Sequence, residues 1–312
     1  NIFIPECLHQ LKHDQSQWLD YLIYRYKFKL YPQQHHVSEF PFYLLIEPVS
    51  SCNLRCTMCF QSDRSFTRKP FMGIMDMVLY RRIVDEAHAG GTRAVTLASR
   101  GEPTMHPQFS DMLQYATGKF LDFKVNTNAT RLDEKMCHDI LSSGVNELVF
   151  SIDSHVKEIY ESIRLKGDFD EVQKNVERFH NIRSKYYPKS MLTTRVAGVR
   201  VREDQDPEGF VAFWSQYADH VGLKDALERW DTYQNDPIPL DHACHNLWER
   251  MYVWFDGTSN VCDADYKSKL SPGNVADQSL ASIWTGEAYT KMREAHLAGQ
   301  RDNYLPCDRC GV

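Results

Sequence analysis

The chain lacks the features of several large protein classes. No apolar segment approaches the roughly 20 residues that span a bilayer, and no signal-peptide pattern is present, so we expect a cytoplasmic protein without a membrane partner. No long run of like charges occurs and the net charge is −6. A nucleic-acid partner is therefore not expected, because binding to phosphates needs a basic surface. Gly-x-Gly-x-x-Gly, P-loop and Ser/His/Asp patterns are also absent.

What the sequence does contain is an ordinary globular composition with an unusual use of cysteine. Its 312 residues are 42% hydrophobic and 25% charged, which suits one large domain and one small one. Nine residues are cysteine, and most of them fall into two closely spaced groups. A small secreted domain would place such cysteines in disulfides. A chain of this length without an export signal instead favours metal or cluster ligation in a reducing cytosol.

Apolar strands alternate with amphipathic helices between residues 41 and 230. We predict strands over residues 43–49, 94–99, 123–126, 147–152, 192–199 and, more weakly, 220–224. Apolar residues between the strands recur at helical spacing, as Leu79, Ile83 and Ala87 do. This alternation predicts an α/β fold with a parallel sheet, a partial (β/α)6 TIM-like barrel. Its functional site is expected at the carboxyl ends of the strands.

The segments on either side of this barrel have a different character. Residues 1–40 form an aromatic-rich N-terminal arm, which we expect to pack over the barrel. Residues 231–312 predict a small cluster-binding α+β domain, with a polar linker, a hairpin that turns at Asp256-Gly257 and an amphipathic helix over 280–296. A domain of about 80 residues with several cysteines is of the size that needs a metal to hold it together.

The first cysteine group follows directly on the first predicted strand. Cys52, Cys56 and Cys59 have the spacing C-x3-C-x2-C. Three thiolates from one loop can bind three corners of a [4Fe–4S] cluster and leave the fourth iron open to an external ligand. The alternative is a zinc knuckle, which would need a fourth Cys or His nearby. The nearest candidate, His88, lies in a predicted helix.

This cysteine loop, placed after the first strand of a partial barrel, resembles the radical S-adenosylmethionine (SAM) superfamily. Further motifs agree in order and position over roughly residues 42–226. Gly101-Glu102-Pro103, at the end of the second strand, is similar to the motif that holds the methionyl amino group. Asn126 ends the third strand and resembles the family's polar contact there. Ser151 and Arg164 are similar to the residues that contact the ribose and the carboxylate.

Two residues of the loop concern the adenine of the cofactor. The residue before the third cysteine is usually aromatic in this family, and here it is Met58. Its backbone typically meets the adenine, so the resemblance still implies a contact, with Phe60 as a candidate for the aromatic surface. The resemblance implies SAM and a [4Fe–4S] cluster as cofactors, and an external electron donor such as flavodoxin or ferredoxin. It also implies that Glu102 orients the ammonium and that Arg164 pairs with the carboxylate.

The second cysteine group lies near the end of the chain. Cys244 and Cys262 have the spacing C-x12-G-x4-C, and Cys307 and Cys310 close the sequence as C-x2-C. This pattern resembles the auxiliary-cluster domain called SPASM, in its shortened one-cluster form known as the twitch domain. The resemblance implies a second [4Fe–4S] cluster whose four ligands leave no open iron. A structural zinc site with four cysteines is the alternative.

The resemblance implies a reaction in which a 5′-deoxyadenosyl radical abstracts hydrogen from the substrate. A closed second cluster suits dehydrogenation, because it can accept the electron that the substrate radical loses. We therefore favour an oxidoreductase that acts on a small, carbohydrate-like molecule. The 40-residue arm is shorter than the peptide-binding domain of peptide-modifying relatives. Arg200 and Arg202 could face a carboxylate or phosphate of the substrate, or lie on the surface.

Three alternatives stay open at this point. A radical epimerase would need a hydrogen-atom donor such as a thiol, for which Cys7 is available, whereas Cys137 is expected to pack in a helix. A peptide-modifying (RiPP maturation) enzyme would act on a larger substrate. A zinc- or cluster-binding scaffold would have no catalytic activity. The catalytic acid or base is not identified by the sequence.

Overall fold

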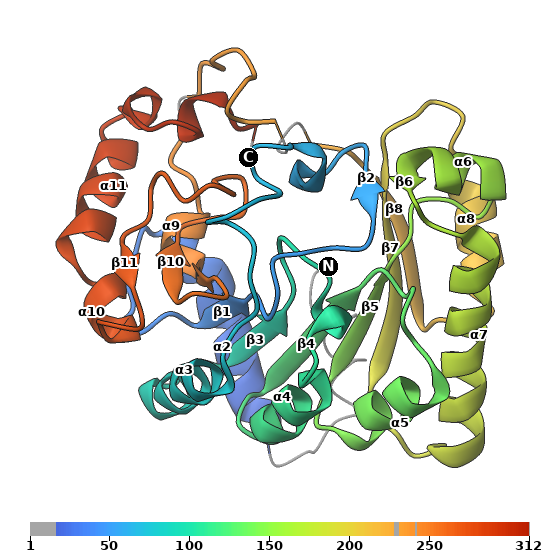
Figure 1. Ribbon diagram of the computed structural model, residues 1–312. Coiled ribbons are helices and arrows are strands. Elements are labelled where there is room, and N and C mark those ends of the chain that lie inside the picture. The colour runs from blue at the N-terminus through green and yellow to red at the C-terminus, as the bar shows by residue number, and fades with distance from the viewer. Residues whose placement is uncertain (1–16, 228–230, 241, 312) are drawn as a thin grey trace.

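The computed structural model describes residues 17–227, 231–240 and 242–311. A nine-stranded sheet with the order β11-β10-β9-β1-β3-β4-β5-β7-β8 organises these residues (Figure 1). Its parallel strands are β1 (Tyr43–Ile46), β3 (Ala94–Leu97), β4 (Asp122–Thr127), β5 (Glu147–Ser151), β7 (Thr193–Arg200), β8 (His220–Asp225) and β9 (Arg250–Val253). The six strands predicted between residues 43 and 224 are confirmed, and so is the α/β fold with a partial barrel.

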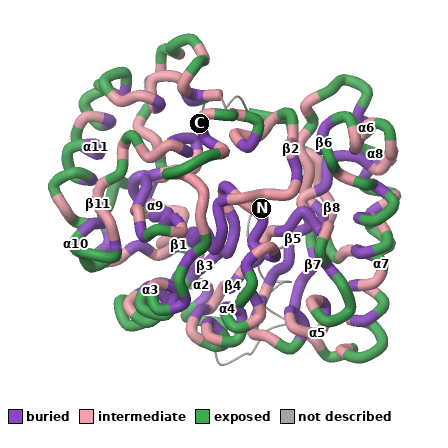
Figure 2. The backbone as a smooth tube through the Cα atoms, viewed as in Figure 1, coloured by how far each residue is buried: buried purple, intermediate pink, exposed green. Residues whose placement is uncertain are grey.

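Helices cover the outer face of this sheet (Figure 1). They are α3 (Met77–Gly90), α4 (Phe109–Ala116), α5 (Glu134–Ser142), α6 (Lys157–Ile163), α7 (Phe169–Tyr186) and α8 (Pro207–Trp214). Asp side chains cap the amino ends of α3, α5, α7 and α8 by accepting a backbone N–H, which fixes where each helix begins. The buried residues follow the strands, and exposed residues occupy the outer helix surfaces (Figure 2).

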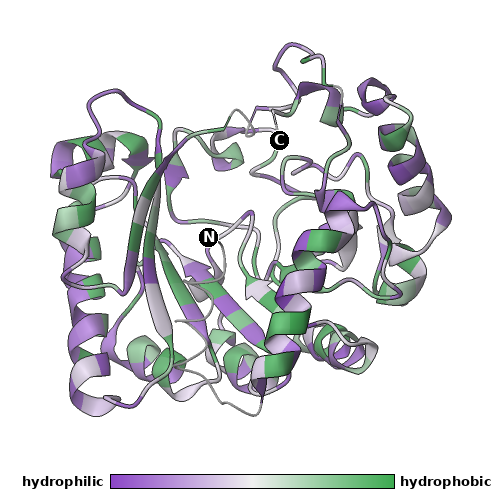
Figure 3. Cartoon of the chain, turned by 180° about the vertical axis from the view of Figure 1, so that it is seen from behind, coloured by the Kyte–Doolittle hydropathy of each residue, from purple (hydrophilic) through white to green (hydrophobic). Residues whose placement is uncertain are grey.

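Strand alternation gives the sheet two different faces. In β5, Leu148 and Phe150 point outward into the core beneath the helices. The inner face is polar, since Glu147 of β5 accepts ion pairs from Lys124 of β4 and Arg195 of β7. Hydrophilic and hydrophobic residues accordingly both occur along the strands (Figure 3). The inside of this barrel can therefore receive a polar ligand.

The C-terminal segment does not form a sheet of its own. The predicted hairpin is confirmed as β9 paired with β10 (Thr258–Asn260), and β11 (Gly273–Asn274) follows β10. However, β9 also pairs in parallel with β1, so the hairpin extends the barrel sheet beyond its first strand. An open barrel leaves that edge unpaired, and the hairpin satisfies it. The proposed domain limits at residues 40 and 230 remain predictions.

The helix predicted over residues 280–296 is two helices. α10 (Leu280–Trp284) and α11 (Glu287–Leu297) are separated at Gly286, where an added Cβ would lie 2.5 Å from the carbonyl oxygen of Ser282. The short helix α9 (Asn246–Glu249) precedes β9. Among the described helices, none combines the length and hydrophobicity of a membrane span.

The described part of the N-terminal arm is α2 (Trp18–Gln33), which packs as predicted. Tyr21 and Tyr24 are buried against Ala94 and Tyr43, residues at the amino ends of β3 and β1. The arm therefore covers the amino ends of the strands and leaves their carboxyl ends, where the cysteine loop begins, uncovered by α2. Cys7 lies outside the described residues.

Candidate active site

The first cysteine loop starts where β1 ends. Within it, β2 (Arg55–Cys56) pairs with β6 (Arg164–Leu165), which sets Cys56 opposite Arg164. Two sulfurs accept backbone N–H groups, from Leu54 to Cys52 at 3.4 Å and from Gln61 to Cys59 at 3.5 Å. Local folding of the loop thus orients the thiols before any ligand binds.

The chemistry of these three thiols fits a cluster. Burial raises the pKa of Cys52 and of Cys59 to about 12 and also raises that of Cys56, so the thiolates need cations to form. Within the described residues, no three Cys, His, Asp or Glu side chains are grouped to hold one metal ion. A cubane accepts thiolates at three separate corners, which three cysteines of one loop can supply.

Glu102 lies beside the loop at the end of β3. Its carboxylate accepts hydrogen bonds from the hydroxyls of Thr104 and Thr127 and from the backbone N–H of Asn128, all at 2.7 Å. Burial raises the pKa of this carboxyl, so a bound cation would favour its ionised form. Gly101 permits the close approach, because a Cβ there would lie 2.1 Å from the carbonyl oxygen of Val49. The role predicted for Glu102, to orient an ammonium group, is consistent with this environment.

Arg164 is fixed between the loop and the barrel. Its Nε donates to Asp153 at 2.7 Å, and one terminal nitrogen lies 4.0 Å from the sulfur of Cys56. Burial disfavours the charge, but Asp153 and Cys56 raise the pKa of the guanidinium above its usual value. The backbone N–H of Val199 also donates to Asp153, which ties the pair to β7. A permanent cation therefore stands next to the cysteine loop.

A cavity of about 290 Å³ joins these groups at the carboxyl ends of the strands. Among the predicted residues, it is lined by Cys52, Cys56, Met58, Cys59, Gly101, Glu102, Asn126, Ser151 and Arg164. The side-chain oxygen of Asn126 is buried without a hydrogen-bond partner in the described structure, which a polar ligand in the cavity would satisfy. The roles assigned to these residues remain predictions, but the structure brings them to one place.

Phe60 is the exception. Its ring does not line the cavity but stacks on Tyr266, with the ring centroids 5.1 Å apart, and contacts Phe66 at 5.6 Å. Burial of apolar surface in this aromatic group outweighs exposure in a polar cavity. The role of Phe60 as an aromatic surface for adenine stays a prediction, without support from this arrangement.

A residue that sequence reasoning left without a role connects the barrel to the C-terminal segment. Arg100 forms a buried two-pronged ion pair with Glu47 and donates to the carbonyl oxygen of Tyr266 at 2.9 Å. Its guanidinium also lies 4.2 Å from the ring centre of Trp254. The sequence feature that could have pointed to Arg100 is Glu47, an acidic residue directly after the apolar run of β1. A carboxylate buried at that position requires a basic partner.

The structure also brings the second cysteine group together. Cys244 precedes α9, Cys262 follows β10, and Cys307 and Cys310 lie in and after the short helix η5 (Cys307–Arg309). Cys262 and Cys307 each interact electrostatically with Cys244, and Cys307 also with Cys310. The guanidinium of Arg301 donates to the carbonyl oxygens of Cys307 and Cys310 and so holds the last pair.

The two cysteine groups face the same region. Asp263, the residue after Cys262, lines the cavity of the first loop. A larger chamber of about 540 Å³ continues inside the barrel along β5, β7 and β8, and it shares Ser151 and Arg164 with the first cavity. Cofactor-sized and substrate-sized spaces are therefore adjacent.

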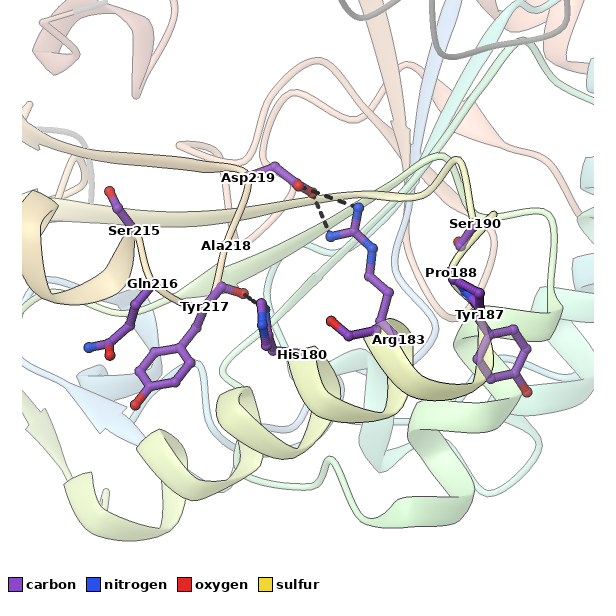
Figure 4. Close-up of a pocket in the computed structure, with 11 residues that line it drawn as sticks. His180, Arg183, Tyr187, Pro188, Ser190, Ser215, Gln216, Tyr217, Ala218 and Asp219 are labelled. Atoms are coloured by element: carbon purple, nitrogen blue, oxygen red, sulfur yellow. Dashed lines mark hydrogen bonds and ion pairs between the residues drawn. The ribbon is translucent and has the colours of Figure 1, made fainter.

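A further groove lies elsewhere on the molecule. His180 and Arg183 of α7 contribute to it together with the segment from Ser215 to Asp219, and Arg183 pairs with Asp219 at 2.7 Å (Figure 4). It contains none of the cysteines and none of the predicted site residues. We therefore place the site at the cysteine loops and not at this groove.

Comparison with known families agrees with the geometry. The profile of the radical SAM superfamily matches residues 46–213, more than half of the chain. The chain belongs to the radical SAM superfamily. An iron–sulfur cluster-binding domain, SPASM, matches residues 244–311. Membership implies SAM and iron–sulfur cluster chemistry, and it identifies the chain as a radical SAM enzyme.

Individual proteins resemble the chain over most of its length. A tungsten-containing aldehyde ferredoxin oxidoreductase cofactor-modifying protein from Pyrococcus furiosus is 34% identical over 303 residues, covering 80% of this chain and 83% of that protein. Among solved structures, BtrN in complex with AdoMet and 2-DOIA matches with a TM-score of 0.59 and 16% identity, over 87% of this chain and 93% of that one. SuiB of Streptococcus suis, bound to S-adenosylmethionine, matches with a TM-score of 0.63 and 15% identity over 96% and 77%. These two likenesses establish the fold alone.

Proposed function

We propose that the chain is a radical SAM oxidoreductase that dehydrogenates a small, polar, carbohydrate-like molecule. Cys52, Cys56 and Cys59 would hold one [4Fe–4S] cluster, and the C-terminal cysteine group would hold a second. When bound, SAM and the first cluster supply a 5′-deoxyadenosyl radical that removes a hydrogen atom from the substrate. The observation that carries the proposal is that a residue next to Cys262 lines the cavity of the first cysteine loop.

The chain's own residues perform the binding and positioning. Glu102 would accept hydrogen bonds from the ammonium group of SAM, and Arg164 would pair with the carboxylate of SAM. Hydrogen bonds hold both side chains in place at the cavity wall. Asn126 and Ser151 line the same cavity and offer polar atoms to the ribose.

When a secondary alcohol is oxidised to a ketone, the substrate loses a hydrogen atom from carbon, a proton from the hydroxyl group and one electron. The C-terminal cysteine group would provide the electron acceptor, since four thiolates leave no iron open for other chemistry. An external donor such as flavodoxin or ferredoxin would supply the electron that starts each turnover.

The similar proteins differ in how strongly they support a small-molecule substrate. The relative from Pyrococcus furiosus is named for modifying a cofactor, which favours a small molecule over a polypeptide. BtrN was solved with the small ligand 2-DOIA, whereas SuiB was also solved with its precursor peptide. The described part of the arm, α2, lies at the amino ends of the strands and not at the site, which favours the small-molecule substrate.

Epimerisation is the second candidate, and it needs a hydrogen-atom donor. Cys137 lies on the buried face of α5, fully enclosed in the core, and does not line the cavity. The described residues therefore offer no thiol at the site apart from the proposed cluster ligands. Dehydrogenation needs no such donor.

The decisive experiment is anaerobic reconstitution followed by reduction in the presence of SAM. We expect about eight irons per chain and release of 5′-deoxyadenosine. Zinc with no iron would establish the non-catalytic scaffold instead. Incorporation of solvent deuterium into a recovered substrate would favour epimerisation and contradict dehydrogenation.

A further inference from the structure

The chamber inside the barrel is lined by more basic than acidic side chains. We propose, resting on the proposed function, that the substrate carries an oxyanion, a phosphate or a carboxylate, and that Lys224 binds it at the carboxyl end of this chamber, whose other end carries Arg195 and His220. The general chemistry is that ammonium, guanidinium and imidazole groups donate charge-assisted hydrogen bonds to such oxygens.

Strand register places the three basic residues on one wall. Arg195 of β7 lies opposite His220 of β8, and Val199 lies opposite Lys224. Because side chains alternate along a strand, His220, Gly222 and Lys224 share one face, and all three line the chamber. His220 and Arg195 lie nearer the amino ends, whereas Lys224 stands at the carboxyl ends, where the cofactor cavity begins.

Nearby carboxylates are already committed to other partners. Glu147 is paired with Lys124 and Arg195, and although burial opposes ionisation, these cations hold the pKa of its carboxyl below the usual value. Asp153 is paired with Arg164. Among the charged residues that line the chamber, Arg164, Arg195 and Lys224 are basic and Asp153 alone is acidic. Even with Glu147 counted as the partner of Arg195, the chamber keeps an excess of positive charge.

Lys224 itself has no acidic partner in the described part of the chain. Asp225, its neighbour in β8, points to the opposite face and pairs with Arg200 at 2.7 Å. Arg200 and Arg202, for which the sequence left open a substrate anion or a surface position, do not line the chamber, and Arg202 pairs with Asp204. Lys224 is thus a free cation directed at a chamber, and not a member of a surface ion pair.

The wall between the basic residues leaves room for a ligand. Gly222 separates His220 from Lys224, and a Cβ added there would meet no atom within 4 Å. The chamber shares Ser151 and Arg164 with the cofactor cavity, so an anion held by Lys224 would anchor the rest of the substrate toward the site of hydrogen abstraction. Anchoring a remote group in this manner positions the reacting carbon.

The test measures binding of inorganic phosphate and of malonate to the reconstituted holoenzyme with SAM, by calorimetry at constant ionic strength. We expect one or both anions to bind, about tenfold more weakly to Lys224→Gln and nearly normally to Lys224→Arg. Gly222→Phe, which fills the chamber, should abolish binding. Lys174→Gln, an exposed lysine on the outer helix α7, is the matched control and should not change it.

Each result has a definite meaning. Phosphate alone indicates a phosphorylated substrate, malonate alone a carboxylated one, and both a general oxyanion site. Absence of binding to the wild-type holoenzyme, or binding that Lys224→Gln leaves unchanged, would overturn the inference. Release of 5′-deoxyadenosine by the wild-type enzyme tests the proposed function separately, so failure of one is distinguishable from failure of the other.

Discussion

The two cysteine groups differ in how the chain brings their sulfur atoms together. Cys52, Cys56 and Cys59 belong to one short loop, whose backbone N–H groups already orient two of the sulfurs. The second group is assembled from residues 244 to 310, by a hairpin, a helix and the buried side chain of Arg301. A local loop can hold three ligands and leave one position open. A dispersed set of four would close all positions of the proposed second cluster, and its assembly depends on tertiary structure.

The largest effect is expected from breaking the local group. Cys56→Ala should abolish release of 5′-deoxyadenosine and reduce iron from about eight to about four per chain, because the first cluster loses a ligand and the second does not. Iron analysis and chromatography of the nucleoside measure both results. Cys137→Ala, which removes a core thiol, should retain the full iron content. Retention of SAM cleavage by Cys56→Ala would contradict the assignment of the first loop.

Breaking the dispersed group should separate two activities. Cys262→Ala should lose about half of the iron and formation of oxidised product, yet it should still cleave SAM. Because Cys262 is tied to the hairpin, this variant should also unfold more readily than the wild type. If Cys262→Ala makes oxidised product at the wild-type rate, the second group is structural and not an electron acceptor.

The same contrast explains what the sequence could predict. The cysteine loop was found from its spacing after the first strand, and Glu102, Asn126, Ser151 and Arg164 were found from their resemblance to motifs of the superfamily. Parallel strands bring their carboxyl ends together, which explains why residues so far apart in the sequence meet in one cavity. The strands themselves follow from short apolar runs separated by helical periodicity. Local patterns of this kind specify the barrel and most of the first cavity.

Features that depend on pairing between distant segments were not predictable. Nothing in the hairpin sequence indicates that β9 would pair with β1, since either partner satisfies its backbone. Lys224 was not singled out for a related reason: its place on the chamber wall depends on the pairing of β8 with β7, which the weak strand pattern over 220–224 does not specify. The stacking of Phe60 on Tyr266 was not predictable either, because the two residues are 206 positions apart in the chain.

The connection between the two regions can be tested at Arg100. Arg100→Met should lower the free energy of unfolding by about 3–5 kcal/mol, because it leaves the buried carboxylate of Glu47 without a partner. Denaturant titration under anaerobic conditions measures this loss. The double variant Arg100→Met/Glu47→Gln should recover part of it. An equal loss in both variants would show that the contacts of Arg100 with Tyr266 and Trp254 in the C-terminal segment, and not its ion pair with Glu47 inside the barrel, account for the lost stability.

The smallest effect is expected at a second bridge between the same regions. Asp63, just after the cysteine loop, is paired with Lys267 at 2.7 Å. Partial burial opposes its ionisation, but hydrogen bonds from Lys267, Ser65 and Tyr266 lower the pKa of Asp63 below its usual value. A carboxyl with a lowered folded-state pKa stabilises the protein above the unfolded-state pKa, and that stabilisation is lost only as the pH falls through the folded-state value.

Asp63→Asn should therefore cost about 1 kcal/mol, and this cost should stay constant between pH 8 and about pH 5.5, since the wild-type carboxylate remains ionised throughout. Parallel denaturant titrations at several pH values measure it, with Asp85→Asn as a control for an exposed ion pair away from both cysteine groups. A cost that shrinks as the pH falls toward 5.5 would mean that the carboxyl takes up protons there. Asp63 and Lys267 would then not be the second bridge between the local and the dispersed cysteine groups.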